Sequence, residues 1–385
     1  MSPSYQLPDL LSLCRPFELR TNVFCRPAMI ASEAWLLGLK TTDLNDVLTE
    51  TERTSLHATK TGLLAGLCVP SCGQPQLRFF ADFLSFLIIA DGRIKRAGDA
   101  EGSGWMDGDT ESGIDSLTQH ELFQYLRPEF LRLVARADPS WDTRFAASVH
   151  SYRSAQLQVI TSRLSNVIPD LETYISLRRD LSGLYMILDL IELSENLNIP
   201  LADDGTSKKV AILKQLTADI IGCSLDVFTF NIDQAQGNRH NIITILMENK
   251  RLSLQGALNF AGALIKQFFN SFLETEKSLF CHPTPPQTNH SGTGTLSSYW
   301  NWITSVRLAT PPASPPPGPQ SSNMECGGDT CLGDLPSYVQ TLKDCIVGTI
   351  NWAYETELYF GRKGEEIRTF GWVFFNPKVI GEEHS

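Results

Sequence analysis

Leu225-Asp226-Val227-Phe228-Thr229-Phe230-Asn231-Ile232-Asp233-Gln234 is a stretch whose apolar residues recur at three- and four-residue intervals, the spacing of an amphipathic helix. Leu225, Thr229 and Asp233 lie four residues apart. Four residues advance a helix by ~400°, so each of these side chains is rotated by only ~40° from the one before. The pattern therefore predicts a helix with a hydroxyl and a carboxylate on one face.

The same periodicity extends outward from this stretch over residues 117–272, with few strand-like alternations. Loop and helix-boundary signals separate the apolar runs. They are Pro139-Ser140, Pro169-Asp170, Ile199-Pro200 and Asp203-Asp204-Gly205. We therefore predict an all-α fold of about ten helices joined mostly by short loops.

Two segments interrupt the helical pattern. Residues 92–116 are rich in glycine and acidic residues, which predicts a flexible acidic loop. Residues 282–334 are rich in Pro, Ser, Thr and Gly, a composition that cannot form packed helix. We predict one helical domain made of residues 1–281 and 335–378, an insertion at 282–334 without fixed structure, and a tail at 379–385.

The composition excludes several classes of protein. Of the 385 residues, 42% are hydrophobic, and 43 acidic residues outnumber 32 basic ones. This balance argues against a nucleic-acid-binding protein, which would concentrate positive charge against phosphates. No apolar run approaches the ~18–20 residues that span a bilayer, and the N-terminus lacks the pattern of a signal peptide. We expect a cytoplasmic protein, and the oligomeric state stays open.

The nine cysteines do not suggest a disulfide framework or a zinc site. They are scattered along the chain in an odd number, as in a protein from a reducing compartment. Cys68/Cys72 and Cys326/Cys331 lack the two-residue gap of common zinc ligands, and no His pair follows them.

Upstream, Tyr174-Ile175-Ser176-Leu177-Arg178-Arg179-Asp180-Leu181-Ser182-Gly183 is a second helical stretch. With 225–234 it resembles the fungal class I terpene synthases. In that family an Arg senses diphosphate, a linker residue follows three positions later and an effector Gly four positions later. These roles fall on Arg179, Ser182 and Gly183. Arg179 lies 46 residues before Leu225, the interval that separates the two motifs in the family.

The resemblance implies a set of metal ligands. The family motif Asn-Asp-x-x-Ser-x-x-x-Glu binds magnesium through its first, fifth and ninth residues. Here these positions hold Leu225, Thr229 and Asp233, so a hydroxyl and a carboxylate are retained but Leu225 has no ligand atom.

The family's aspartate-rich motif, Asp-Asp-x-x-Asp, falls on Asp91-Gly92-Arg93-Ile94-Lys95. Only Asp91 retains a carboxylate, because the second position is Gly92 and the last is Lys95. On a helix, residues four apart share a face. Asp91 can therefore be a metal ligand or can form a salt bridge with Lys95 or Arg96.

The C-terminal segment Asn351–Gly361 resembles the one that ends in the family's diphosphate-binding Arg-Tyr pair. Tyr359 matches the Tyr, but Leu358 replaces the Arg. With these four segments the resemblance spans nearly the whole chain apart from the insertion. It implies a single class I terpenoid synthase α-helical bundle enclosing a central pocket, Mg²⁺ as cofactor, and farnesyl diphosphate or a similar isoprenoid diphosphate as ligand.

A pocket that protects an allylic cation is dry and lined by aromatic residues. The sequence candidates for this lining are Phe79, Phe80, Phe83, Phe86, Phe228 and Trp352.

Three hypotheses follow from the altered motif positions Gly92, Lys95, Leu225 and Leu358. The first is a sesquiterpene synthase-like protein with weak or no cyclase activity. The second is a working synthase with an unusual magnesium set that uses Asp91, Asp233 and also Asp99 or Asp107. The third is a non-catalytic module that binds isoprenoid diphosphates or a protein. Four replacements at four functional positions favour the first hypothesis, since each lost charged contact weakens stabilisation of the leaving group.

Overall fold

The structure, a computed structural model, describes residues 4–41, 43–96, 117, 120–197, 199, 205–280 and 333–375. By packing, Met1–Leu279 and Gly333–Ser385 form one unit. The second unit, Phe280–Leu332, lies outside the described residues apart from Phe280. The predicted insertion at 282–334 lies outside them except for its last two residues, and so does the tail at 379–385. Asp99, Asp107, Cys326 and Cys331 also lie outside them.

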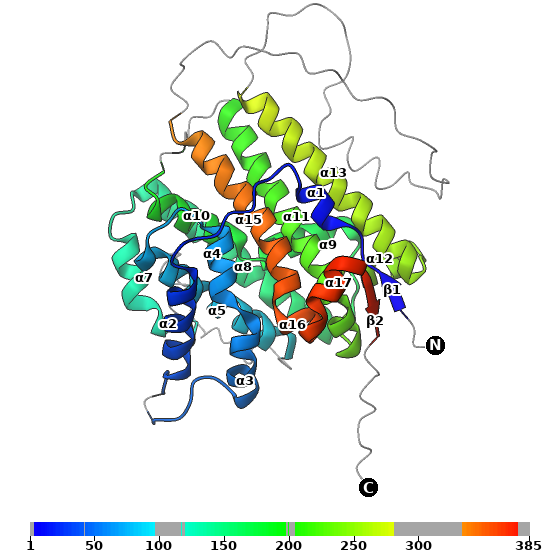
Figure 1. Ribbon diagram of the computed structural model, residues 1–385, viewed down its shortest axis with the longest axis horizontal. Coiled ribbons are helices and arrows are strands. Elements are labelled where there is room, and N and C mark those ends of the chain that lie inside the picture. Colours follow the sequence, from blue (N-terminus) through cyan, green and yellow to red (C-terminus); the bar gives the residue numbers. More distant parts are fainter. Residues whose placement is uncertain are drawn as a thin grey trace, which may run out of the picture. The chain divides into compact units, whose positions relative to one another are not determined.

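The prediction of an all-α fold is confirmed (Figure 1). The α-helices are α1 (Leu10–Cys14), α2 (Cys25–Leu37), α3 (Glu50–Thr59), α4 (Thr61–Cys68), α5 (Gln74–Arg96), α7 (Arg127–Val134), α8 (Pro139–Leu164), α9 (Leu171–Leu181), α10 (Leu184–Ser194), α11 (Gly205–Ala235), α12 (Ile242–Asn249), α13 (Leu254–Phe280), α15 (Leu335–Glu355), α16 (Glu357–Phe360) and α17 (Gly364–Phe370). Short 3₁₀ turns at η2 (Phe123–Tyr125) and η3 (Gly361–Lys363) add to the helical part.

A short antiparallel sheet joins the two ends of the described chain. Strand β1 (Ser4–Gln6) pairs with β2 (Trp372–Phe374), and Tyr5 lies opposite Val373. Tyr5 is buried and contacts the ring of Phe230 edge-on, at 5.8 Å between ring centroids. The sheet therefore anchors the two ends of the described chain to α11, a feature that the helical periodicity did not predict.

Local sequence signals explain where the principal helices begin. Asp138 caps α8 with its side chain, and Pro139 takes the first helical position, where a missing N–H costs nothing. Asp170 caps α9 by accepting a hydrogen bond from the Thr173 amide. Helix α9 ends at Leu181 and α10 starts at Leu184, because Gly183 adopts a left-handed conformation with φ of 66°.

One boundary prediction was wrong. The acidic loop expected at 92–116 does not begin at residue 92, because α5 continues to Arg96. Residues 97–116 lie outside the described residues. The Arg163 side chain of α8 stabilises this end of α5 by donating hydrogen bonds to the carbonyls of Ile94 and Lys95, at 3.0 and 2.7 Å. These bonds supply partners for carbonyls that a helix end leaves unpaired.

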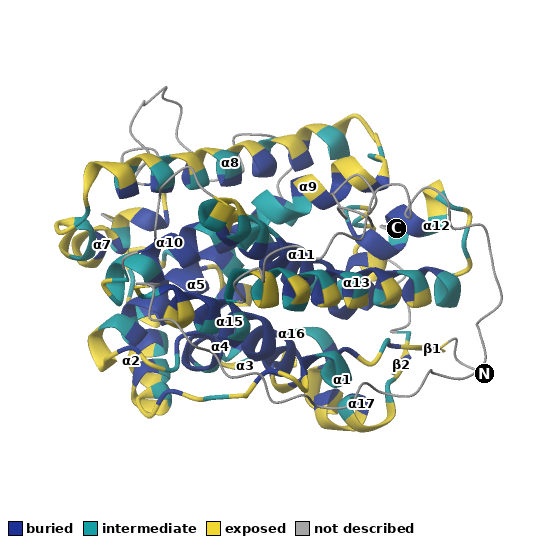
Figure 2. Cartoon of the chain, turned by 90° about the horizontal axis from the view of Figure 1, so that it is seen from above, coloured by how far each residue is buried: buried dark blue, intermediate teal, exposed yellow. Residues whose placement is uncertain are grey.

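Six helices form a closed ring around the centre of this unit, and each packs against the next. In order they are α5, α4, α15, α11, α9 and α8, and α8 returns to α5. Figure 1 shows α11 and α15 side by side, and Figure 2 shows both largely buried. Among the described residues, no helix combines the length and the apolar character needed to cross a bilayer.

The contact between α15 and α4 is close enough to require glycine. A Cβ added at Gly348 would lie 2.8 Å from the backbone carbonyl carbon of Leu67. We therefore expect Gly348→Val to lower the free energy of unfolding by about 1–3 kcal/mol through overpacking. Denaturant unfolding measures this change. As a control, Gly205→Val should change it by less than ~0.5 kcal/mol, because no atom lies within 4 Å of a Cβ at Gly205. Equal losses would contradict the steric explanation.

Candidate functional site

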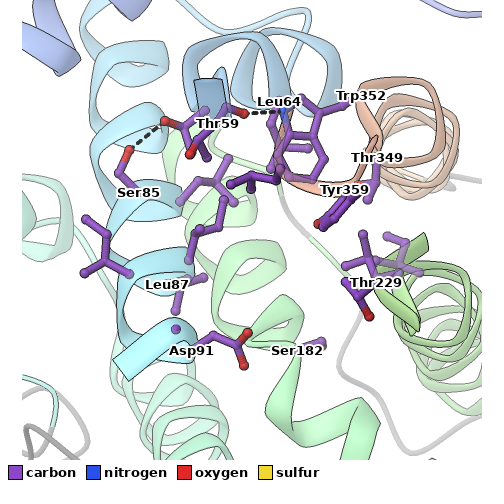
Figure 3. A pocket seen from close by; sticks show the side chains of 18 of the residues that line it. Thr59, Leu64, Ser85, Leu87, Asp91, Ser182, Thr229, Thr349, Trp352 and Tyr359 are labelled. Carbon is purple, nitrogen blue, oxygen red and sulfur yellow. Dashed lines mark hydrogen bonds between the residues drawn. The ribbon is translucent and has the colours of Figure 1, made fainter. Parts of the chain in front are cut away.

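A cavity of about 420 Å³ lies among the helices of this ring. Its volume is within the range of small-molecule binding sites. Its walls are mainly aliphatic. Asp91 and Ser182 lie at one end, called the polar end below, and Thr59 and Ser85 lie at the opposite end (Figure 3). Aliphatic lining residues include Leu56, Leu64, Leu84, Leu87, Ile88, Leu184, Ile187 and Ile221. Such a lining suits a branched hydrocarbon chain.

The fold brings most of the sequence-predicted positions to this one cavity. Those that line it are Asp91, Gly92 and Lys95 from α5, Ser182 after α9, Leu225, Thr229 and Asp233 from α11, and Leu358 and Tyr359 from α16. Figure 3 shows Asp91, Ser182, Thr229 and Tyr359 around the space. Segments far apart in the chain therefore meet at one site, as expected if the four motifs belong together.

Lys95 lies between the two carboxylates that remain at metal-ligand positions of these motifs. Its Nζ is 3.2 Å from Asp91 Oδ2 on the same helix and 3.6 Å from Asp233 Oδ1 on α11. Burial disfavours the ammonium charge, but the carboxylates of Asp91 and Asp233 outweigh it and raise the pKa of Lys95. The salt bridge between Lys95 and Asp91 considered above is thus present, and Asp233 extends it across the cavity.

Asp233 is buried and its other hydrogen-bonding positions are occupied. Oδ2 accepts from the Thr229 hydroxyl at 2.6 Å and from Asn241 Nδ2 at 2.9 Å, while Oδ1 accepts from Asn238 Nδ2 at 2.9 Å. Burial raises the pKa of Asp233, but Lys95 and these donors reverse the shift and lower it overall. The carboxylate that should bind metal is therefore fully engaged with protein groups.

These residues do not fit a magnesium cluster. Mg²⁺ prefers oxygen ligands in octahedral geometry and is usually held through carboxylates. Among the described residues, no group of three or more His, Cys, Asp or Glu side chains could hold a metal ion. The lysine ammonium occupies the space between Asp91 and Asp233, and Thr229 donates its hydrogen to Asp233. We therefore derive no reaction step through a bound metal.

The arginine that reaches the cavity is Arg178, the neighbour of the predicted Arg179. Arg178 lines the cavity, and its Nε donates to Asp226 Oδ1 at 2.7 Å. Arg179 is absent from the lining and pairs in a bidentate manner with Asp219, at 2.8 and 3.1 Å. Adjacent residues on a helix are rotated by ~100°, so the two arginines point in different directions. The diphosphate-sensing role of Arg179 stays a prediction.

Asp226 has a role that could not be predicted from the sequence. Besides Arg178 it accepts hydrogen bonds from the Tyr174 hydroxyl and, at 3.1 Å, from the Ile242 amide. It is 3% exposed and does not line the cavity. Asp226 therefore connects α9 and α12 to α11 and fixes the side chain of Arg178.

The predicted aromatic lining was wrong for five of its six residues. Of the candidates only Trp352 lines the cavity. Phe79, Phe80, Phe83 and Phe86 contact one another, and Phe83 and Phe86 also meet Phe123, at 6.2 and 5.6 Å between ring centroids. Leu84, Leu87, Ile88 and Asp91 face the cavity from α5 instead. Phenylalanines therefore fill the core on the other side of α5, where they cannot stabilise a cation in the cavity.

Phe228, the remaining candidate, lies behind Tyr359. The two rings are stacked at 6.4 Å between centroids, and Trp352 meets Tyr359 edge-on at 5.7 Å. These contacts fix the Tyr359 ring against the cavity wall. Its hydroxyl forms no hydrogen bond with any residue that the structure describes, so it is available to a ligand.

Polar groups at the opposite end of the cavity satisfy one another. The Ser85 hydroxyl donates to Thr61 Oγ1 at 2.8 Å, and Trp352 Nε1 donates to the Thr59 carbonyl at 3.0 Å (Figure 3). Because these groups are already paired, this end presents a largely apolar surface.

Comparisons with known proteins agree with this geometry. Residues 102–270 match the family described as "Terpene synthase family 2, C-terminal metal binding". The sesquiterpene synthase Agr1 of Cyclocybe aegerita is 30% identical over 380 residues, which cover 97% of this chain and 93% of that protein. The chain belongs to the fungal class I terpene synthase family.

A second relative and a solved structure extend the match. Alpha-muurolene synthase of Coprinopsis cinerea is 31% identical, and the alignment covers 95% of this chain and 76% of that protein. The crystal structure of hedycaryol synthase in complex with nerolidol is similar in fold, with a TM-score of 0.59 and 17% identity. It covers 91% of this chain and 99% of that one. The terpene synthase fold is thus established for this family member.

Proposed function

We propose that this terpene synthase family member binds an isoprenoid in its cavity but has weak or no ability to ionise and cyclise farnesyl diphosphate. The observation that carries the proposal is the position of Lys95, whose ammonium lies between Asp91 and Asp233. A tethered cation at this point competes with a metal ion for both carboxylates.

The chemistry explains why the loss should be severe. Departure of diphosphate leaves ~3 negative charges that metal ions and cationic side chains must stabilise as they develop. Gly92, Lys95 and Leu225 have replaced metal ligands of the family motifs, and Leu358 stands where the family has an Arg. Each missing charged contact costs about 2–4 kcal/mol of transition-state stabilisation, or roughly 10²–10³ in rate.

Isoprenoid binding is supported by the rest of the cavity. Its aliphatic walls and the aromatic faces of Trp352 and Tyr359 suit a branched hydrocarbon. Two relatives that align along the chain are named sesquiterpene synthase and alpha-muurolene synthase. The hedycaryol synthase structure holds nerolidol, which suggests that a cavity of this fold also accepts a neutral sesquiterpene alcohol.

A product assay tests the proposal. Purified protein is incubated with farnesyl diphosphate and Mg²⁺, and the extracted hydrocarbons are analysed by gas chromatography with mass detection. We expect cyclised product at least ~10²-fold below that of an active relative assayed in parallel, since several charged contacts are missing. Alpha-muurolene synthase is a suitable comparison. Abundant Mg²⁺-dependent cyclised product would overturn the proposal and favour an unusual metal set.

A further inference from the structure

Lys95 is held in the site from both its backbone and its side chain. Arg163 fixes the carbonyl of Lys95, and the ammonium spans from Asp91 on α5 to Asp233 on α11. The Lys95 side chain is 29% exposed, and Asp233 is 3% exposed. The lysine therefore joins two walls of the cavity through two ion pairs, one with the exposed Asp91 and one with the buried Asp233.

In the described part of the chain, the positive charges at the polar end are balanced by carboxylates, so no net positive charge remains for a strongly anionic ligand. The cations that line it in the described part of the chain are Lys95 and Arg178, and both already face carboxylates. Asp91 and Asp233 line the same end, and Asp226 lies behind Arg178. A diphosphate needs an excess of positive charge or bound metal to offset its charge, and it would lie against Asp91 and Asp233.

The same groups suit a ligand hydroxyl. An ammonium has three N–H donors. Asp91 lies within hydrogen-bonding distance of the Lys95 ammonium, at 3.2 Å, whereas Asp233, at 3.6 Å, is an ion-pair partner without a hydrogen bond. The Tyr359 hydroxyl can donate or accept, and within the described residues it forms no hydrogen bond. Asp91 is 38% exposed, and its carboxylate can accept a hydrogen bond from a ligand hydroxyl. A single alcohol group can therefore find both a donor and an acceptor here.

We propose that Lys95 is a resident cation that replaces the metal ions of this site, so that the cavity binds an uncharged isoprenoid alcohol in preference to the corresponding diphosphate and without metal. This inference rests on the proposed isoprenoid cavity and names the chemical class of its ligand. The alkyl chain lies along the aliphatic wall, and the hydroxyl meets Lys95, Asp91 and Tyr359.

Farnesol and farnesyl diphosphate form a matched pair of probes, because they share one C15 chain and differ only in the head group. Binding of each to the full chain is measured by calorimetry, with Mg²⁺ and with a chelator. We expect farnesol to bind at least about tenfold more tightly than farnesyl diphosphate, because the carboxylates repel the anion. Chelation should change the farnesol affinity by less than about twofold. Tighter binding of farnesyl diphosphate in Mg²⁺, or no binding of farnesol, would overturn the proposal.

A second measurement tests the role of Lys95 directly. Mn²⁺ binding is followed by electron paramagnetic resonance in wild type, Lys95→Met and Lys95→Asp. We expect no binding in wild type and measurable binding in both variants, which remove the competing ammonium from between Asp91 and Asp233. Lys343→Met is the control, because Lys343 is similarly part-buried, at 20% exposed, and pairs with Glu276 away from the cavity. Wild-type Mn²⁺ binding as strong as that of Lys95→Met would contradict the proposal that Lys95 takes the place of the metal ions.

The two proposals fail in different ways. Formation of cyclised product overturns the proposed loss of turnover. If no product forms and farnesol does not bind, the loss of turnover stands and the ligand class named here is wrong. The product assay and the binding assay therefore test the two proposals separately.

Discussion

The combined variant Gly92→Asp/Lys95→Asp/Leu225→Asn/Leu358→Arg is expected to produce cyclised hydrocarbon from farnesyl diphosphate at least ~10³-fold faster than wild type. The reason is electrostatic, since it restores two carboxylates, one amide and one guanidinium around the leaving group and removes a competing ammonium. Each such contact is worth roughly 10²–10³ in rate, and contacts that act together are not additive. The measurement is product formation per enzyme with Mg²⁺ and with a chelator.

Two comparisons make this result specific. Adding Asp233→Asn to the combined variant should abolish the gain, because Asp233 is the one carboxylate that α11 contributes to the cavity lining. Lys95→Asp alone should restore metal binding but little turnover, since Leu225 and Leu358 remain. If the combined variant binds Mn²⁺ yet forms no product, the idea that the head-group end limits turnover is wrong, and the contour of the aliphatic cavity is the cause.

The sequence predicted the helical architecture and the convergence of the four segments because both depend on spacing. Helix starts at Pro139 and Leu171 follow from local signals that act over a few residues. The meeting of Asp91, Thr229 and Tyr359 at one cavity follows from the family resemblance, which spans nearly the whole chain.

Directions around a helix axis were harder to predict than positions along it. The 46-residue interval before Leu225 selects Arg179. However, neighbouring residues on a helix point in directions ~100° apart. In the structure it is Arg178 that lines the cavity. The same limit applies to Phe83 and Phe86, because apolar periodicity does not show which apolar face of a buried helix meets the core and which meets the cavity.

The contact between Lys95 and Asp233 could not be predicted from local spacing. Lys95 and Asp91 are four residues apart, a spacing that predicts an ion pair. Asp233 lies on another helix, α11, and the packing of the helices between α5 and α11 brings its carboxylate within 3.6 Å of the Lys95 ammonium. A metal-ligand motif can therefore be recognised as altered from sequence, while the replacement that occupies the site becomes visible only in three dimensions.

Asp226→Asn is expected to lower the free energy of unfolding by about 3–5 kcal/mol, the largest stability effect that we predict. Asp226 is buried and accepts from Arg178, Tyr174 and the Ile242 amide. Loss of the Asp226 charge leaves the part-buried Arg178 guanidinium without its nearest counter-ion. Removing one partner of a buried ion pair costs more than the intact pair contributes. Denaturant unfolding measures the loss, and the change in midpoint should occur at unchanged slope.

A double-mutant cycle separates this charge effect from loss of packing. Arg178→Met/Asp226→Asn should recover part of the stability lost in Asp226→Asn, because no unpaired charge is left inside the protein. Glu248→Gln serves as the control, since its partner Arg239 is 43% exposed and solvent screens the pair. Additive losses in the cycle would show that Asp226 acts through its hydrogen bonds to Tyr174 and Ile242 alone. Coupling would show that the ion pair itself holds Arg178 at the cavity, because the guanidinium has no other charged partner as close in the described chain.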